Sequence, residues 1–311
     1  MRLLVLGAGG IGGYFGGRLA EAGADVTFLV RPGRAAQLAR DGLVVRSPAG
    51  DIERAARFIG VDDLEGDGRH DAVLLTCKAY DLDPAITAVA PAVLNGARVI
   101  PLLNGMRHLD RLDAAFGRAA VLGGLCQIAA TLTPGGEVLH LNALHTLLLG
   151  PRAENQGGVA ADFARAAAGA RFECRASEDI IQDMWEKFVM LAAMAGMTCS
   201  MRANVGEIMR TDDGEALTLE LLAECDDVAR AAGYPARPAF LDRARALLTE
   251  RGSAFAASML RDVERGGPTE AAHVVGDMLA RSREAGLVAP MLRVAWCHLQ
   301  AHEARQAAGR A

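Results

Sequence analysis

One lysine lies at the edge of a long apolar segment, a position suited to proton transfer. Lys187 follows Trp185-Glu186, and residues 188–196 carry no charged side chain. A helix that is apolar all round is buried, so we expect a lysine at its edge to be partly desolvated. Desolvation lowers the pKa of a lysine and eases proton donation near neutral pH. The alternative is a simple i,i+4 ion pair with Asp183, worth roughly 0.2–0.5 kcal/mol.

Other polar positions could contact a ligand. Lys78 and Asn104-Gly105 each follow an apolar run that predicts a buried strand. Because ligands of open α/β sheets bind beyond the carboxyl ends of the strands, both positions are candidate contacts. As alternatives, Lys78 is a surface lysine and Asn104-Gly105 is a turn pair with no further role. Glu270 is the last candidate, although Thr269 as a helix cap would place it in a first turn, where the helix dipole alone favours a carboxylate.

A glycine-rich turn near the start of the chain predicts a bound dinucleotide. Residues 2–6 predict a strand, residues 7–12 read G-x-G-x-x-G, and residues 11–22 predict a helix. The glycines permit a tight turn, close approach of a pyrophosphate and close packing of helix on strand, and the helix start offers N–H groups to the phosphates. The motif is specific because it stands between a strand and a helix. The expected cofactor-binding residues are Gly7, Ala8, Gly9, Gly10, Ile11 and Gly12.

The residue after the second predicted strand selects the nucleotide. At this place an acid binds the ribose 2′-hydroxyl of NAD, whereas a basic side chain accepts the 2′-phosphate of NADP. The strand at 25–30 is followed by Arg31, with Arg34 close behind and no acid. A charge-assisted bond from arginine to phosphate predicts NADPH as the cofactor. The alternative is that Arg31 is a solvated loop charge.

The first half of the chain alternates strand and helix patterns. Such alternation predicts a doubly wound parallel sheet with right-handed crossovers, the Rossmann-type arrangement that the glycine turn requires. The expected strands are 2–6, 25–30, 43–46, 52–59, 72–77, 98–103, 121–130, 137–141 and 146–149, and the expected helices are 11–22, 34–40, 82–94 and 109–116.

The second half has helical patterns and almost no strand pattern. The sequence therefore predicts an α/β protein, with an N-terminal Rossmann-type doubly wound sheet followed by an all-α C-terminal domain. We place the NADP-binding domain at 1–174 and the helical substrate or dimerisation domain at 175–311. The expected helices are 177–199, 213–232, 237–249, 256–265, 270–285 and 291–307.

Composition excludes several classes of protein. The net charge of −5 gives no basic footprint for nucleic acid. No apolar stretch approaches the ~18 residues of a membrane span, and the apolar run at 3–6 is too short for a signal peptide. The six cysteines are widely scattered without a CxxC pair, so neither a disulfide framework nor a metal site is predicted. We expect a cytoplasmic protein with no nucleic-acid or membrane partner.

Taken in order, these segments resemble the ketopantoate reductase (2-dehydropantoate 2-reductase) family over nearly the whole chain. Several ordered matches are more specific than any one motif. The matching segments are GAGGIG at 7–12, Arg31, Thr76-Cys77-Lys78-Ala79, Asn104-Gly105-Met106, Gly150-Pro151, Trp185-Glu186-Lys187, Ser258–Asp262, Thr269-Glu270 and Ala289-Pro290.

The resemblance implies reduction of a 2-oxo acid by NADPH, namely 2-dehydropantoate (ketopantoate) to pantoate in the pantothenate and coenzyme A pathway. It implies that Lys187 is the general acid that protonates the carbonyl oxygen. Glu270 would orient Lys187 or hold the nicotinamide ribose. Asn104 would touch both cofactor and substrate, and Ser258 would hold the substrate carboxylate.

At the other end of the cofactor, the resemblance implies that Arg31 and Lys78 bind the adenosine-end phosphate. Ala129 would contact the cofactor through its backbone. The oligomeric state stays open, because the Met- and Ala-rich segments 190–201 and 216–232 could pack within the chain or across a homodimer.

The chain departs from the family along one wall of the expected substrate site. Where the family usually has asparagine, this sequence has Leu191, Ala195 and Val275. A site built to hydrogen-bond a hydroxyl rejects an analogue that lacks it, and the converse suggests a 2-oxo acid with an apolar side chain. His273 or Arg202 is the candidate replacement for the missing polar contacts.

Two further functions stay open. The first is an NADPH-binding sensor without catalysis, although a sensor needs neither Lys187 nor Glu270. The second is a 3-hydroxyacid dehydrogenase, which shares the architecture and also uses a lysine in its helical domain. The segments at 258–262 and 269–270 fit the reductase better.

Overall fold

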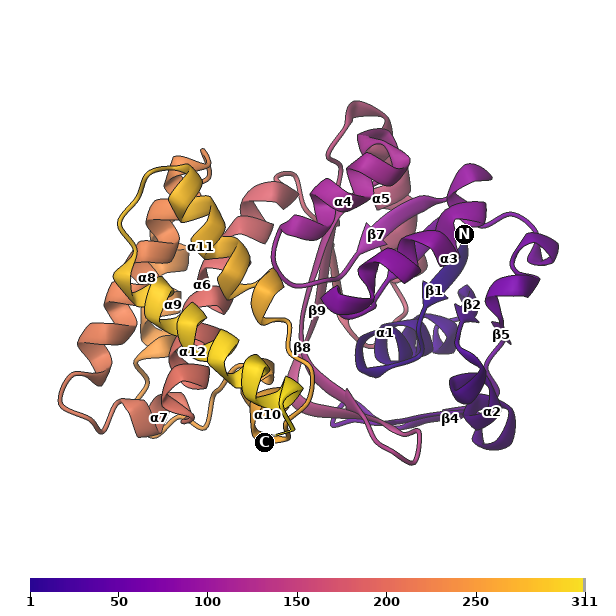
Figure 1. The fold of residues 1–311 in the computed structure, drawn as a ribbon. Coiled ribbons are helices and arrows are strands. Elements are labelled where there is room, and N and C mark those ends of the chain that lie inside the picture. Colours follow the sequence, from indigo (N-terminus) through magenta and orange to yellow (C-terminus); the bar gives the residue numbers. More distant parts are fainter. Residues whose placement is uncertain (310–311) are drawn as a thin grey trace. The chain divides into compact units, whose positions relative to one another are not determined.

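The computed structural model describes residues 1–309, which form two compact units (Figure 1). The first unit comprises Met1–Leu103 and His108–Ile181. The second comprises the short segment Asn104–Arg107 and the chain from Gln182 onward. The chain therefore enters the second unit twice. Within the described residues, no helix combines the length and apolar character needed to cross a membrane.

The first unit contains a five-stranded parallel sheet with β1 at its centre. The strand order is β5-β2-β1-β6-β7, and all four residues of β6 are buried, as expected for a parallel sheet covered on both faces. The strands are β1 (Arg2–Leu6), β2 (Asp25–Leu29), β5 (Phe58–Ile59), β6 (Ala72–Leu75) and β7 (Arg98–Pro101).

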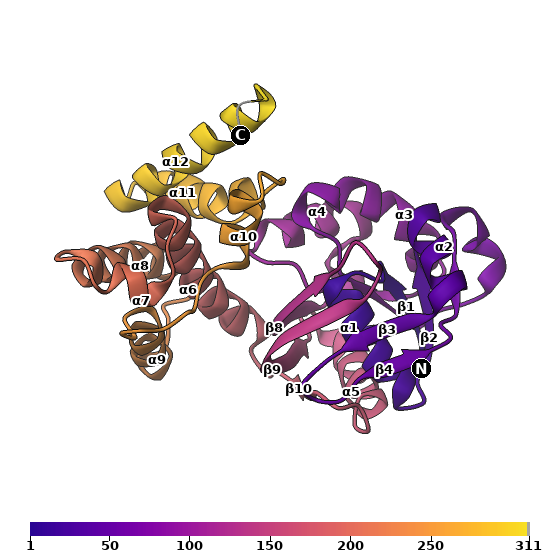
Figure 2. The ribbon, with the colours of Figure 1, turned by 90° about the horizontal axis from the view of Figure 1, so that it is seen from below.

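A second, mixed sheet packs on the other side of α1 (Gly10–Glu21). Helix α1 contacts β2 of the first sheet and β3, β8 and β9 of the second, and Figure 2 shows it beside both. The fully buried side chains of Tyr14, Phe15 and Leu19 fill this layer. The strands of this sheet are β3 (Leu43–Arg46), β4 (Ile52–Arg54), β8 (Gly123–Leu132), β9 (Val138–Gly150) and β10 (Glu173–Ala176).

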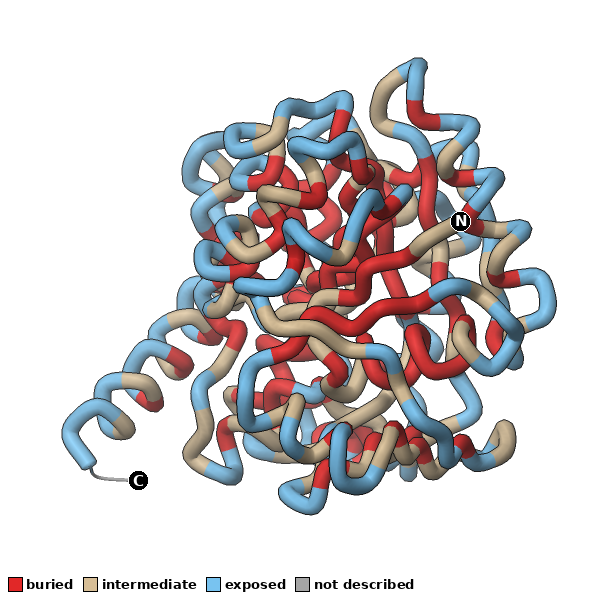
Figure 3. The backbone as a smooth tube through the Cα atoms, turned by 90° about the vertical axis from the view of Figure 1, so that its right-hand side faces the viewer, coloured by how far each residue is buried: buried red, intermediate tan, exposed pale blue. Residues whose placement is uncertain are grey.

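The predicted fold class is confirmed, with four local differences in the first unit. The strand expected at 52–59 is two strands in two different sheets, and the strands expected at 137–141 and 146–149 are the single strand β9. Helix α5 and strand β10 were not predicted. The helices of the first unit are α1, α2 (Pro32–Asp41), α3 (Leu82–Leu94), α4 (Arg107–Phe116) and α5 (Gly157–Ala166). Figure 3 shows buried residues along the central extended segments of the backbone and exposed residues in many of the loops around them.

The second unit is helical throughout its described part. Its longest helix, α6, packs so closely on two neighbours that a Cβ at Gly196 would lie 2.8 Å from Leu221 of α8 and 3.3 Å from Ala295 of α12. The four-residue helix α7 was not predicted. The helices are α6 (Ile180–Met201), α7 (Val205–Ile208), α8 (Gly214–Ala231), α9 (Pro238–Leu248), α10 (Ser258–Glu264), α11 (Val275–Glu284) and α12 (Pro290–Ala307).

Candidate active site

The glycine turn has the geometry of a phosphate cradle. Gly7 has a φ of +90°, which glycine adopts without strain. A Cβ at Gly12 would overlap the Gly7 carbonyl oxygen and Thr76 Oγ1, so only glycine lets α1 start this close to β1. A Cβ at Gly9, in contrast, would meet no atom within 4 Å. The first N–H groups of α1 therefore face a space that no side chain fills. A pyrophosphate could occupy this space.

Strand β8 passes directly over this turn. A Cβ at Gly10 would lie 2.9 Å from the carbonyl oxygen of Ala130. The neighbouring residue Ala129, a candidate cofactor contact, is therefore brought close to the glycine turn. Its backbone N–H donates to Asn142 Oδ1 at 3.3 Å, across an irregularity in the β8–β9 pairing.

The structure also brings the candidate nucleotide-selecting residues together. Arg31 follows β2, Lys78 follows β6, and these strands flank β1. The Arg31 guanidinium donates to Asp81 Oδ1 at 2.9 Å, and this bond raises the pKa of Arg31. The Arg31 side chain is 73% exposed and Lys78 is exposed, so both cations can reach a ligand. A phosphate at Arg31 would lie near the Asp81 carboxylate.

Arg34 lies close behind Arg31 in the sequence, but it was not among the predicted cofactor-binding residues. Its Nε donates to the carbonyl oxygen of Ala8 at 2.9 Å, and its Nη1 donates to that of Gly136 at 2.8 Å. Burial lowers the pKa of Arg34, and its Nη2 lies buried without a hydrogen-bond partner in the described chain. Arg34 therefore holds the glycine turn and retains donor capacity beside it. Its spacing of three residues after Arg31 was the available signal.

The segment Trp185-Glu186-Lys187 sends its three side chains to three different partners. Trp185 is buried and stacks on Tyr234 with ring centroids 5.9 Å apart. Glu186 is also buried, and it accepts from the backbone N–H of Arg237 at 2.9 Å and from its Nε at 2.7 Å. Two anchored residues thus fix the helical turn that presents Lys187.

Lys187 meets a loop from a distant part of the sequence. Its Nζ donates to Asn104 Oδ1 at 3.1 Å. The next residue, Gly105, has a φ of +77°, and a Cβ there would lie 2.7 Å from the carbonyl oxygen of His273. Glycine is therefore required for Asn104 to reach Lys187.

Glu270 lies beside the same loop, next to His273. The carbonyl oxygen of Glu270 accepts from the backbone N–H of His273 at 3.0 Å, and both residues are buried. Burial lowers the pKa of His273, against the opposing effect of the Asp277 and Glu270 carboxylates. The second unit therefore gathers an amine, an amide and a carboxylic side chain around the Asn104-Gly105 turn, a set suited to acid–base chemistry.

Comparison with known proteins identifies the family of this chain. The model of ketopantoate reductase PanE/ApbA matches residues 3–154, and that of its C-terminal domain matches residues 179–303. The chain belongs to the ketopantoate reductase family. It is therefore an oxidoreductase that acts on CH–OH groups.

Three similar proteins cover almost the whole chain. The uncharacterized oxidoreductase YkpB of Bacillus subtilis is 37% identical over 98% of this chain and 100% of its own. The 2-dehydropantoate 2-reductase of Geobacter metallireducens is 27% identical, with a TM-score of 0.87 over 97% of this chain and 99% of its own. D-mandelate dehydrogenase, solved with NADH and anilino(oxo)acetate, shares the fold at 19% identity, with a TM-score of 0.89 over 99% of both chains.

The three positions that depart from the ketopantoate reductase pattern lie in different environments. Ala195 and Val275 are fully buried, so they are part of the packed core of the second unit. Leu191, one turn after Lys187, keeps partial exposure. Among the three positions, only Leu191 therefore keeps side-chain surface that is open to a ligand.

Two other candidate substrate contacts lie near the C-terminal part of α6. Ser258 is the exposed first residue of α10, and the preceding N–H of Ala257 donates to Thr198 Oγ1 at 3.4 Å. Thr198 lies about 16 Å along the helix axis from Lys187, and Arg202 about 22 Å. A small 2-oxo acid that contacts Lys187 is therefore beyond the reach of Arg202.

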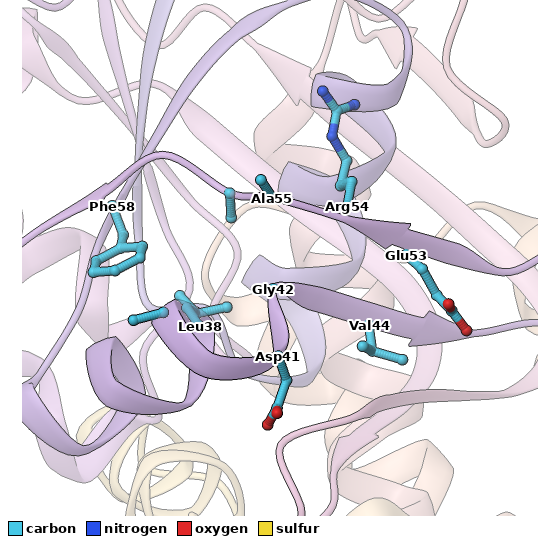
Figure 4. A pocket seen from close by; sticks show the side chains of 10 residues that line it. Leu38, Asp41, Gly42, Val44, Glu53, Arg54, Ala55 and Phe58 are labelled. Carbon is cyan, nitrogen blue, oxygen red and sulfur yellow. The ribbon is translucent and has the colours of Figure 1, made fainter.

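An open hollow in the first unit lies apart from these residues. It has a volume of about 490 Å³ and is lined by residues 38, 39, 41, 42, 44, 53–56 and 58. Figure 4 shows Leu38 and Phe58 on one side of it and Glu53 on the other. None of the candidate site residues lines it, so its shape carries no information on the reaction of this ketopantoate reductase family member.

Proposed function

We propose that this protein reduces a 2-oxo acid to the 2-hydroxy acid with NADPH, and that ketopantoate, which gives pantoate, is the substrate. The observation that carries the proposal is the 3.1 Å hydrogen bond from Lys187 Nζ to Asn104 Oδ1, which holds a proton donor at a residue three positions after the end of strand β7. The names of relatives support the substrate, since a 2-dehydropantoate 2-reductase of Nostoc is 24% identical over 98% of this chain.

Residues 1–174 hold the cofactor in this proposal, and residues 175–311 hold the substrate together with Asn104. The glycine turn takes the pyrophosphate, and Arg31 and Lys78 take the 2′-phosphate. The Ala129 backbone contacts the cofactor beside the glycine turn. When bound, the reduced nicotinamide supplies a hydride to the carbonyl carbon.

The side chains of the second unit complete the reduction. As negative charge develops on the carbonyl oxygen, the cationic side chain of Lys187 stabilises it. Lys187 then transfers a proton from Nζ to that oxygen. Asn104 accepts one N–H of Lys187, which fixes the direction of the others. Glu270 orients Lys187 or holds the nicotinamide ribose, and Ser258 donates to the substrate carboxylate.

Initial rates of NADPH and NADH oxidation with ketopantoate, 2-oxoisovalerate and larger 2-oxo acids test the proposal. We expect NADPH to exceed NADH in kcat/KM by at least about tenfold, as one charge-assisted bond to the 2′-phosphate provides. NADPH binding without turnover of any 2-oxo acid would instead identify a sensor. Oxidation of a 3-hydroxy acid with NADP⁺, without 2-oxo acid reduction, would identify the related dehydrogenase.

A second candidate substrate is a 2-oxo acid with an apolar side chain. Leu191, the partly exposed residue one turn after Lys187, favours it, as does the likeness in fold to D-mandelate dehydrogenase. If this candidate is right, 2-oxoisovalerate or a larger apolar acid has the highest kcat/KM. Leu191→Asn then raises kcat/KM for ketopantoate and lowers it for the apolar acid, whereas Val294→Asn, a similar change at an exposed apolar position of α12, alters neither. A wild-type preference for ketopantoate by orders of magnitude contradicts it.

The turn at Gly105 provides a further prediction about the same reaction. Gly105→Ala adds a methyl group against the His273 carbonyl at a positive φ, so it displaces Asn104 from Lys187. We expect kcat/KM to fall by about 10²-fold, the order expected for a displacement near 1 Å, with a smaller rise in the NADPH dissociation constant from the lost Asn104 contact.

Gly117→Ala is the matched control for this change. Gly117 has a φ of +76°, but a Cβ there would meet no atom within 4 Å. The control carries similar backbone strain without a collision, so it should lose some thermal stability and keep its kcat/KM. Equal losses of activity in both variants would show that strain, and not the position of Asn104, matters.

A further inference from the structure

Two imidazoles on α12 lie one helical turn apart with unused polar atoms. His298 and His302 are four residues apart and therefore share one face of the helix. In each ring Nε2 is buried without a hydrogen-bond partner in the described chain. The His302 residue is only 6% exposed. Buried polar atoms are nearly always satisfied, so this pair calls for an explanation.

The residue that follows α6 supplies a cation to the same place. Arg202 is exposed, and among the described residues it forms no ion pair with a carboxylate. Its φ of +49° is left-handed, and it is the one non-glycine residue of the described chain with a positive φ. The N–H of Ala203 donates back to the Thr198 carbonyl at 3.2 Å, a helix end that usually has glycine at the position of Arg202. The strain of an arginine here suggests a function for its side chain.

Electrostatic effects connect the three residues. Burial, and then the Arg202 charge, lowers the pKa of both His298 and His302. The pKa of His302 is also affected by Glu303, which raises it, and by Arg305, which lowers it. A carbonyl of the neighbouring helix, that of Cys199, hydrogen-bonds to His298. Burial raises the pKa of the Cys199 thiol, and the Asp262 and Glu264 carboxylates raise it further.

We propose that Arg202, His298 and His302 form a binding site for a small oxyanion, a phosphate or carboxylate group. The cation and the two imidazoles provide donors for such a group, and its charge would offset the mutual repulsion of three basic side chains. A metal ion fits less well because Arg202 repels it, and no group of three His, Cys, Asp or Glu ligands occurs among the described residues. The site is distinct from the reaction centre, since Arg202 lies about 22 Å along α6 from Lys187.

Binding at this site takes up protons. Because the Cys199 carbonyl already engages His298, the Nε2 of that ring must gain a proton before it can donate to an anion. The bound anion in turn favours the protonated imidazoles. Affinity is therefore higher near pH 6 than near pH 8, on the two sides of the ordinary histidine pKa of about 6.5.

The test is titration of the phosphate-free full-length protein with inorganic phosphate and, separately, with succinate. Proton NMR follows the histidine Cε1–H resonances at about pH 6 and at about pH 8. The resonances are assigned from single His→Gln variants. We expect saturable shifts for His298 and His302 and none for the other five of the seven histidines. A response to phosphate alone, or to both anions, distinguishes a phosphate site from a general oxyanion site. Absence of saturation, or equal shifts in all seven, overturns the proposal.

Two arginine variants distinguish a direct contact between Arg202 and the anion from a general effect of positive charge on anion binding. Arg202→Gln is expected to weaken phosphate binding by at least about tenfold, the effect of one charge-assisted hydrogen bond. Arg293→Gln, which removes an exposed arginine of α12, is expected to leave binding unchanged. Equal affinity in the two variants contradicts the site.

Arg202→Gly provides an independent readout by thermal unfolding. Glycine adopts the left-handed conformation without strain, so we expect this variant to unfold at a higher temperature than wild type when phosphate is absent. Phosphate should then raise the unfolding temperature of wild type and not that of the variant, since only wild type binds it. A glycine variant stabilised by phosphate as much as wild type is evidence against the proposal.

Discussion

Replacing Lys187 with alanine is expected to lower kcat by at least about 10²-fold while the NADPH dissociation constant stays near that of wild type. The amine lies at Asn104 in the second unit, whereas the glycine turn, Arg31 and Lys78 lie in the first unit. Loss of the proton donor therefore affects the chemical step and leaves the expected cofactor contacts intact. Single-turnover rates and fluorescence titration with NADPH measure the two quantities separately.

The chain offers matched controls because it has only two lysines, Lys78 and Lys187, among its 33 basic residues. Lys187→Arg keeps the charge, but a guanidinium does not deprotonate in proteins, so this variant should be nearly as inactive as alanine. Lys78→Ala should instead raise the KM for NADPH with little change in kcat. An unchanged kcat in Lys187→Ala would remove this lysine from the mechanism.

Arg237→Ala is expected to lower the free energy of unfolding by about 3 kcal/mol, at the lower end for a broken buried ion pair. Arg237 holds Glu186 with Nε at 2.7 Å and a second nitrogen at 2.7 Å, and the Glu186 side chain is only 5% exposed. Without the guanidinium, the Glu186 carboxylate stays buried and keeps hydrogen bonds only from the backbone N–H of residue 237 and from Gln182 among the described residues. Urea unfolding measures the loss.

Two controls for this prediction come from the same part of the chain. Arg245 is 54% exposed, as is Arg237, but its partner Asp242 is 76% exposed, so Arg245→Ala should cost less than about 1 kcal/mol. Glu186→Gln added to Arg237→Ala removes the unpaired buried charge without a change of volume. This double variant should therefore be more stable than Arg237→Ala alone, and a further loss would contradict the role assigned to burial.

Local patterns were sufficient to predict the strands and helices that carry their own signal. The glycine turn, the buried strand β6 and the long apolar helix α6 are each defined by the residues within them. The segment 52–59 shows the limit of prediction from local patterns. Ile52–Arg54 pairs antiparallel with β3, whereas Phe58–Ile59 pairs parallel with β2. Apolar periodicity says that a segment is extended, but not which strand it will join.

Some features of the candidate site were likewise predictable from local sequence, whereas others depend on tertiary structure. Residue type and spacing indicated Lys187 as a proton donor and Gly7–Gly12 as a phosphate cradle. The hydrogen bond between Lys187 and Asn104 joins residues 83 positions apart, so no local pattern predicts it. Ala195 was expected at a substrate wall, but burial of this position depends on tertiary packing of α6, which the sequence alone does not give.

The double entry of the chain into the helical unit has a consequence for protein engineering. Asn104–Arg107 belongs to that unit, although it stands between β7 and α4 of the first. A chimera that exchanges only the part after residue 181 would keep one protein's Asn104-Gly105 turn against another protein's lysine and carbonyl groups. We therefore expect substrate range to transfer between relatives only when these four residues are exchanged together with the residues after 181. The segments expected to determine substrate specificity are thus separated in the gene.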